Sequence, residues 1–187
     1  MKKLLLTTLL LTTPFGISGA SAAEYVIDVE GMHAAINFKV RHVGISWLTG
    51  RFDKFAGTFS YDEDNLLASK VSVDIDVGSV NSNHEARDKH IQDPSYLNVE
   101  AHPMAHFEST SIEKTSDTTA IINGNLTLNG VTKPFALMTT HVGQGDDPWG
   151  GYRAAFEATA MVNPQDFDFK FEYGDVELNL YVEGIRQ

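Results

Sequence analysis

Apolar and polar side chains alternate along most of this chain. Residues 34–42 place Ala34, Ile36, Phe38, Val40 and His42 on one side of an extended segment. A period of two is the pattern of a β-strand with one dry face. Five later segments repeat the pattern: residues 71–77, 123–128, 135–139, 156–162 and 176–182.

Turn signals separate these segments. Asn129-Gly130 lies between two alternating runs, which is typical of a two-residue hairpin, and Asn163-Pro164 marks a later turn. The chain shows neither an internal repeat nor a linker. We therefore predict one all-β domain of about eight strands, either an antiparallel barrel or a sandwich.

One segment departs from the alternation, "NSNHEARDKHI" at residues 81–91. Ser82 to Glu85 fits a capping box, and Glu85 and Lys89 have the i,i+4 spacing of a favourable ion pair. We predict a short helix over residues 83–91 that ends at Asp93-Pro94.

The histidines of this region raise the question of a metal site. On a helix His84 and His90 would lie about 120° apart, and on a strand His102 and His106 would lie about 13 Å apart. Neither pair can share one ion that sits about 2 Å from each ring nitrogen. Unless the fold draws His42, His84 or His90 together, we predict no metal site.

Two interpretations of the polar residues near the predicted helix stay open. Arg87 is three residues from both His84 and His90, so these side chains could pair locally in a simple connector between strands. Alternatively, Arg87 and His90 form a polar lip beside a cavity mouth. His42 is in phase with apolar residues and should point to the dry face, either as a satisfied core residue or as a hydrogen-bonding group for a bound molecule.

The N-terminus has the three parts of a secretory signal peptide. Lys2 and Lys3 precede an apolar run at residues 4–11, and Ala20-Ser21-Ala22 matches a cleavage site. We expect residues 1–22 to be removed, leaving residues 23–187 as a single domain in the periplasm. No later apolar run approaches the roughly 20 residues of a membrane helix, so we expect no transmembrane segment.

Composition and motifs exclude several kinds of chemistry. The net charge of −11 disfavours a nucleic-acid partner, and the lack of cysteine rules out thiol chemistry and cysteine-bound zinc. The sequence has no Gly-x-Ser-x-Gly elbow, and the glycine-rich residues 143–151 lack the Lys-Ser/Thr of a phosphate-binding loop. We interpret that stretch as an ordered loop with Trp149 packed down. We predict no catalytic residue and no cofactor, and therefore a protein that is not an enzyme.

Aromatic residues are frequent between positions 38 and 59 and again downstream. They could simply fill a core, but eight strands that close into a barrel enclose room for one small ligand. Small residues at inward positions would add to that room: Ala34, Gly57, Gly124, Ala158 and Ala160.

Several stretches together resemble the YceI-like family of polyisoprenoid-binding, lipocalin-like periplasmic proteins. They are "HAAINFKVRHVGISWLTGRFDKFAGTF", "NSNHEARDKHIQDPSYLN", "HPMAHFEST", "NGNLTLNGVTKPF" and "GQGDDPWGGYRAAFEA". The resemblance covers nearly all of the expected mature chain. It implies a lipocalin-like antiparallel β-barrel with a short helix, an isoprenoid or fatty amphiphile in the barrel, and a homodimer in some members. The family has no established catalytic residues to carry over.

We therefore expect a periplasmic carrier that holds a polyprenyl or quinone-type molecule inside the barrel. Its head group should meet His42, or Arg87 and His90. Its apolar tail should lie against ten residues: Ile36, Phe38, Val40, Phe59, Val73, Ile75, Phe107, Leu126, Leu128 and Phe156. Two alternatives stay open: an enzyme that acts on a lipid or quinone in the barrel, with His42 or His90 moving protons, and a stress-associated interaction protein with a solid core.

Overall fold

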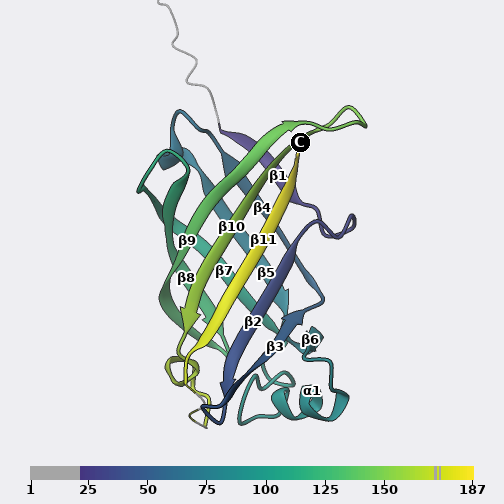
Figure 1. Ribbon diagram of the computed structural model, residues 1–187. Coiled ribbons are helices and arrows are strands. Elements are labelled where there is room, and N and C mark those ends of the chain that lie inside the picture. Colours follow the sequence, from purple (N-terminus) through teal and green to yellow (C-terminus); the bar gives the residue numbers. More distant parts are fainter. Residues whose placement is uncertain (1–21, 171, 173) are drawn as a thin grey trace, which may run out of the picture.

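The computed structural model of the protein describes residues 22–170, 172 and 174–187. The expected signal peptide, up to residue 21, lies outside these residues. Within them, eleven strands form one sheet (Figure 1). The strands are β1 (Ala23–Ile27), β2 (Ala35–His42), β3 (Ser46–Phe52), β4 (Phe55–Tyr61), β5 (Lys70–Asp76), β6 (Val80–Asn81), β7 (Met104–Lys114), β8 (Thr119–Leu128), β9 (Val131–Asp146), β10 (Tyr152–Val162) and β11 (Val176–Arg186). The helical elements are α1 (Glu85–Ile91) and three 3-10 turns, η1 (Leu66–Ala68), η2 (Val77–Ser79) and η3 (Pro164–Phe167).

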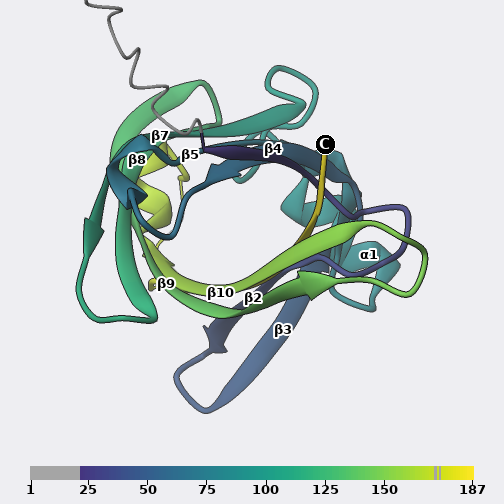
Figure 2. The same ribbon diagram turned by 90° about the horizontal axis from the view of Figure 1, so that it is seen from above.

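Eight of these strands close into a barrel, which Figure 2 shows from above. The hydrogen-bonded order is β1-β4-β5-β7-β8-β9-β10-β11, and β11 pairs back onto β1 with Ile185 opposite Val26. Neighbouring strands run antiparallel, and closure leaves the barrel wall without an open edge. The prediction of an all-β antiparallel barrel with a short helix is confirmed.

β2 and β3 complete the wall at one end of the barrel. β11 pairs with β1 near its C-terminus and with β2 near its N-terminus, where Leu178 lies opposite Phe38. β3 follows from β2 and pairs with the short β6. We call the end with α1 and the β2–β3 turn the helix end, and the opposite end, with the β9–β10 turn, the hairpin end (Figure 1).

The alternating segments of the sequence overlap β2, β5, β8, β9, β10 and β11. The predicted hairpin at Asn129-Gly130 joins β8 to β9, with φ angles of 50° and 74°. Two consecutive left-handed residues are the signature of a type I′ turn, whose twist matches the flanking strands. Asn129 Nδ2 also donates to the carbonyl of Phe167 at 2.9 Å, which ties η3 to the turn.

Helix α1 lies where it was predicted, but His84 caps it. His84 Nδ1 accepts a hydrogen bond from the Arg87 N–H at 3.2 Å. The Ser82 hydroxyl instead contacts Arg87 and Asp88 side chains, so the capping-box interpretation is wrong. The expected ion pair is present, with Lys89 Nζ 3.0 Å from a Glu85 carboxylate oxygen.

The β9–β10 turn closes around a carboxylate. Asp147 accepts hydrogen bonds from the N–H groups of Trp149 (2.9 Å) and Gly151 (2.8 Å). Trp149 is 77% exposed, so the prediction that it packs down is wrong. Its indole lies beside the Arg153 guanidinium, 5.6 Å from the ring centre.

Gly57 and Gly124 do not leave room for a ligand, contrary to the prediction. A Cβ on Gly124 would lie 2.6 Å from the ring of Phe107, and a Cβ on Gly57 would lie 2.9 Å from Ile27. These glycines accommodate core side chains pressed against the strand backbone. Two other rings lie on glycines in the same way, Phe38 on Gly50 and Phe59 on Gly184.

Candidate functional site

Two cavities lie end to end inside the barrel. The larger, of about 490 Å³, is at the helix end, and the smaller, of about 160 Å³, is at the hairpin end. Four side chains line both cavities: Ile36, Ile75, Leu126 and Leu178. We call the two cavities together the lumen. The larger one alone falls in the range of about 300–1,000 Å³ that is usual for ligand pockets.

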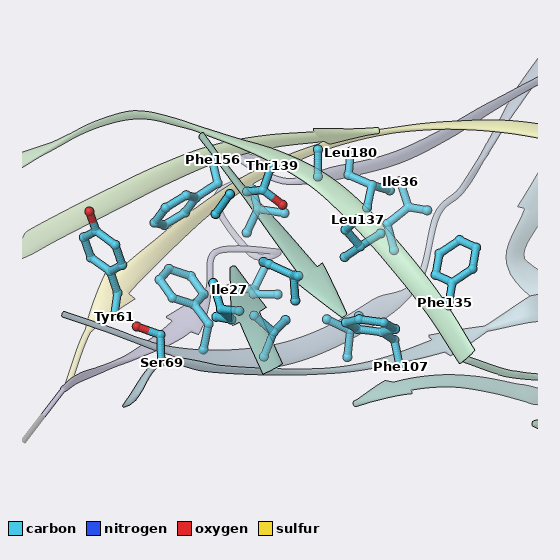
Figure 3. A pocket seen from close by; sticks show the side chains of 18 of the residues that line it. Ile27, Ile36, Tyr61, Ser69, Phe107, Phe135, Leu137, Thr139, Phe156 and Leu180 are labelled. Carbon is cyan, nitrogen blue, oxygen red and sulfur yellow. The ribbon is translucent and has the colours of Figure 1, made fainter. Parts of the chain in front are cut away.

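The wall of the smaller cavity is built from the inward positions of the strands, and it is almost wholly apolar (Figure 3). Four of its lining residues carry a polar group: Ser60, Tyr61, Ser69 and Thr139. The Ser60 hydroxyl accepts from the backbone N–H of Lys70 at 3.0 Å, and the Ser69 hydroxyl accepts from that of Asp62 at 3.2 Å.

The larger cavity has an apolar wall and a polar mouth. Its polar lining residues lie at the helix end: Arg41, His42, Arg87, His90 and Tyr96. The Arg87 guanidinium donates to the Ser82 hydroxyl (2.7 Å) and carbonyl (2.6 Å), and the His90 ring packs edge-on against Tyr96 at 4.9 Å. The Arg87 guanidinium therefore braces the connector through Ser82 and not through the predicted pairing with His84 and His90, and it also lines the mouth.

His42 lines the mouth of the larger cavity on the side that its phase predicts, but it is exposed, so the expectation that it is shielded from water is wrong. The reason is the length of β2. Its pairing with β11 ends at Lys39, and beyond that point β2 pairs only with β3, up to His42 opposite Ser46. The alternation continues in the sequence after the pairing with β11 has ended, so His42 reaches the rim of the larger cavity, where it is open to solvent.

All thirteen residues predicted to contact a ligand line the lumen. Ile36, Ile75 and Leu126 line both cavities. Phe59, Val73, Phe107 and Phe156 line the smaller one, and Phe38, Val40, His42, Arg87, His90 and Leu128 line the larger one. Their contact with a ligand stays a prediction.

Sequence reasoning missed several lining residues, among them Tyr61, Thr139, Phe169 and Leu178. For three of them a signal exists. Tyr61 is in phase with the other aromatic residues of β4. Thr139 is in phase with the apolar residues of β9, and Leu178 is in phase with those of β11. Phe169 lies between η3 and β11 in a segment without a regular period, so no pattern marks it.

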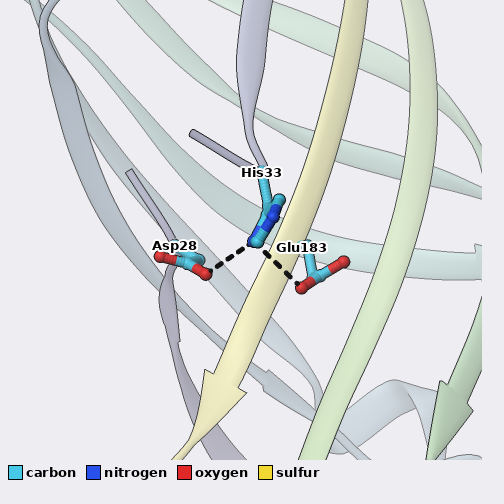
Figure 4. A group of neighbouring side chains, drawn as sticks. All are labelled: Asp28, His33 and Glu183. Carbon is cyan, nitrogen blue, oxygen red and sulfur yellow. Dashed lines mark hydrogen bonds and ion pairs between the residues drawn. The ribbon is translucent and has the colours of Figure 1, made fainter. Parts of the chain in front are cut away.

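Asp28, His33 and Glu183 gather near the hairpin end, close enough for their ligand atoms to surround an ion (Figure 4). However, a cation of the chain already lies between the carboxylates. Arg153 Nη1 is 2.6 Å from an oxygen of Asp28 and 2.6 Å from one of Glu183, and Arg153 Nε donates to Asp147 at 2.9 Å. The bond from Arg153, followed by those from the Gly31 N–H and the His33 ring, lowers the pKa of Asp28 to about 2. We therefore interpret the group as an ion-pair network that ties β1, β11 and the β9–β10 turn together.

A closed antiparallel barrel around an apolar lumen is the architecture of lipocalin-like proteins. A sequence profile of the YceI-like domain matches residues 25–184, and the chain belongs to the YceI-like family. This confirms the resemblance noted in the sequence. Within the described residues, no helix has both the length and the apolar character needed to cross a membrane.

Relatives and solved structures agree with this assignment. UPF0312 proteins of Pseudomonas aeruginosa (strain UCBPP-PA14) and Shewanella baltica (strain OS155) are 50% and 49% identical over 191 residues, with both chains covered in full. The crystal structure of the Campylobacter jejuni YceI protein is 25% identical, with a TM-score of 0.72 over 79% of this chain and 90% of that one. A polyisoprenoid-binding domain from Saccharophagus degradans is 14% identical, with a TM-score of 0.63 over 89% of this chain and 99% of that one.

Proposed function

We propose that this protein is exported to the periplasm and there carries a long apolar molecule, a polyprenyl or quinone-type isoprenoid or a similar amphiphile, in its lumen. The observation that supports the proposal is the lumen itself, two cavities in line with a nearly continuous apolar wall. The Saccharophagus degradans domain of the same fold, described as polyisoprenoid-binding, adds support. An isoprenoid tail offers only dispersion and water exclusion, about 25 cal/mol per Å² buried, and this wall suits it.

The shape of the lumen favours a chain-like ligand over a compact one. The four side chains that line both cavities lie where the cavities meet, and we call these four residues the waist. A ligand that occupies both cavities must extend past them along the axis of the lumen. The ten apolar residues expected from the sequence would contact the tail. At the mouth, His42, Arg87 and His90 would contact whatever part of the ligand reaches solvent.

The positions of the polar groups favour binding over catalysis. The two histidines that line the lumen, His42 and His90, are at the mouth and exposed, whereas a bound tail would lie mostly among aliphatic and phenylalanine side chains. A pH-dependent turnover of a lipid or quinone that is lost in His42→Ala would favour the enzyme instead.

Solvent extraction and mass spectrometry of the protein from a periplasmic fraction test the proposal. The intact mass should correspond to residues 23–187, and the extract should contain an isoprenoid in near-stoichiometric amount. Val40→Asp places a carboxylate in the wall of the larger cavity, and Phe38→Asp does the same at a more deeply buried position. In both variants the lipid should no longer copurify with the protein, because an unpaired charge beside an apolar tail opposes binding.

Asn37→Asp is the matched control, since it adds the same carboxylate on the outer face of β2. It should leave the lipid content unchanged. Circular dichroism identifies variants that have not folded. A folded Val40→Asp protein with the lipid content of the wild type, or a wild-type protein that releases no lipid from the periplasm, would refute the carrier role.

A further inference from the structure

A hydroxyl group without a partner lies in the wall of the smaller cavity. Thr139, on β9, is 8% exposed, and its Oγ1 is buried with no hydrogen-bond partner among the described residues. Figure 3 shows its side chain pointing into the cavity beside Phe156 and Leu137. The hydroxyl therefore faces the space where the ligand would lie.

The chain carries this hydroxyl at a cost to its stability. A buried hydroxyl that makes no hydrogen bond loses the bonds it made to water, and valine would fill the same volume without that loss. Buried polar groups in folded proteins nearly always have a partner. An unpaired one that points into a cavity indicates a partner brought by a ligand.

The next inward position of β9 repeats the feature. His141 Nε2 is also buried without a partner, and its ring packs 5.3 Å from Tyr61 and 5.1 Å from Phe156. Inward positions two apart on a strand are separated by about 7 Å. Thr139 and His141 therefore form a short polar strip that runs from the wall of the smaller cavity towards the hairpin end.

The charges around this strip are those of a site for an uncharged group. Among the described residues that line the smaller cavity, none is charged. Burial, and then the nearby negative charge of Glu63, raises the pKa of Tyr61 next to it. An anionic phosphate would meet no cation here, whereas the mouth at the helix end carries Arg41 and Arg87.

We propose that Thr139, with His141 beside it, holds the uncharged oxygen-bearing head group of the bound amphiphile, an alcohol, a phenol or a carbonyl. The ligand then lies with its head towards the hairpin end and its tail past Ile36 and Ile75 to the mouth. This inference rests on the proposed function, and it places the head at the opposite end from His42, Arg87 and His90.

Thr139→Val tests the inference, because it removes the hydroxyl and keeps the shape. Native mass spectrometry in one detergent would compare three probes with the same tail: geranylgeraniol, the hydrocarbon that lacks the hydroxyl, and geranylgeranyl diphosphate. The wild type should bind the alcohol most tightly. In Thr139→Val the affinity for the alcohol should fall about three- to tenfold while that for the hydrocarbon stays the same or rises.

Two variants serve as controls. Thr140→Val makes the same change at the neighbouring, exposed position of β9 and should keep the wild-type order of probes. Thr139→Ser keeps the hydroxyl and should also keep the preference for the alcohol. Thr139→Val should melt at the temperature of the wild type or above it, because it removes an unpaired buried group.

The outcomes separate this inference from the proposed function. If the wild type binds the hydrocarbon as well as the alcohol, or if Thr139→Val keeps the alcohol preference, the head-group site is refuted and the carrier role stands. If the diphosphate binds most tightly, the head belongs at the mouth and the inference is likewise refuted. If the wild type binds none of the probes, the carrier role fails and the head-group site fails with it.

Discussion

Arg153 joins three segments of the chain at the hairpin end of the barrel. Its side chain is four-fifths buried, and its guanidinium contacts three carboxylates, from the segment after β1, from β11 and from the β9–β10 turn. Planar fork geometry suits arginine to such a role, because each N–H can meet a different oxygen. The network joins parts of the chain that are far apart in sequence, with Asp28 and Arg153 125 positions apart.

Asp28→Asn should therefore destabilise the protein in a pH-dependent way. The folded-state pKa of Asp28, about 2, is below the usual value of about 3.9, so ionised Asp28 contributes stability above about pH 4 and loses it as the pH falls towards 2. At neutral pH we expect a loss of about 1–3 kcal/mol in the free energy of unfolding, measured by urea denaturation. The difference from the wild type should shrink between about pH 4 and pH 2.

The exposed Asp64 provides a control for this variant. Asp64→Asn should change the free energy of unfolding by less than about 0.5 kcal/mol at either pH. Equal stability of Asp28→Asn and the wild type at neutral pH would show that the network contributes nothing.

At the scale of elements, the sequence pattern identified six of the strands that the structure describes, but not what surrounds them. A period of two identifies which side chains of a strand share a face, and the residues that it marked on β2, β5 and β8, among them Phe38, Ile75 and Leu126, line the lumen. The pattern does not show where the pairing with β11 ends, so it did not show that His42 is exposed. It also does not show what lies opposite a glycine, so Gly124 looked like space although Phe107 fills it.

The β8–β9 turn offers a test of local chemistry at this scale. Gly130 has a φ of 74°, and a Cβ there would lie 2.5 Å from the ring of His102. Gly130→Ala combines left-handed strain with a collision, so we expect a loss of about 1–3 kcal/mol in the free energy of unfolding. Thermal and urea denaturation would measure it.

Gly145→Ala on β9 is the matched control, since a Cβ there meets no atom within 4 Å and no left-handed φ is involved. It should be neutral or stabilise by up to about 1 kcal/mol, because alanine restricts the unfolded chain. If Gly130→Ala were as stable as Gly145→Ala, the turn geometry would not be the constraint that the structure indicates.

At the scale of the whole molecule, the two ends of the lumen differ in chemistry. The helix end carries arginine and histidine around its mouth, whereas the lining of the hairpin end carries only hydroxyl groups among apolar side chains. The sequence indicated a closed barrel, but not the division of its interior, because that depends on which inward side chains from opposite walls meet. The waist at Ile36, Ile75, Leu126 and Leu178 arises from β2, β5, β8 and β11, four strands distant in sequence.

That waist decides how long a ligand the barrel can hold. Leu178→Trp adds bulk where both cavities meet, and the neighbouring free space should admit the larger side chain at a cost of about 1–3 kcal/mol or less. An isoprenoid chain could then occupy one cavity only. In native mass spectrometry with isoprenoid alcohols of increasing length, the variant should no longer bind the longest alcohols and should still bind the shortest. Met161→Trp, on the exposed face of β10, adds the same ring outside the barrel and should bind the whole series like the wild type. A folded Leu178→Trp protein that binds the longest alcohols as tightly as the wild type would show that the ligand does not run through both cavities, since no chain could pass a filled waist.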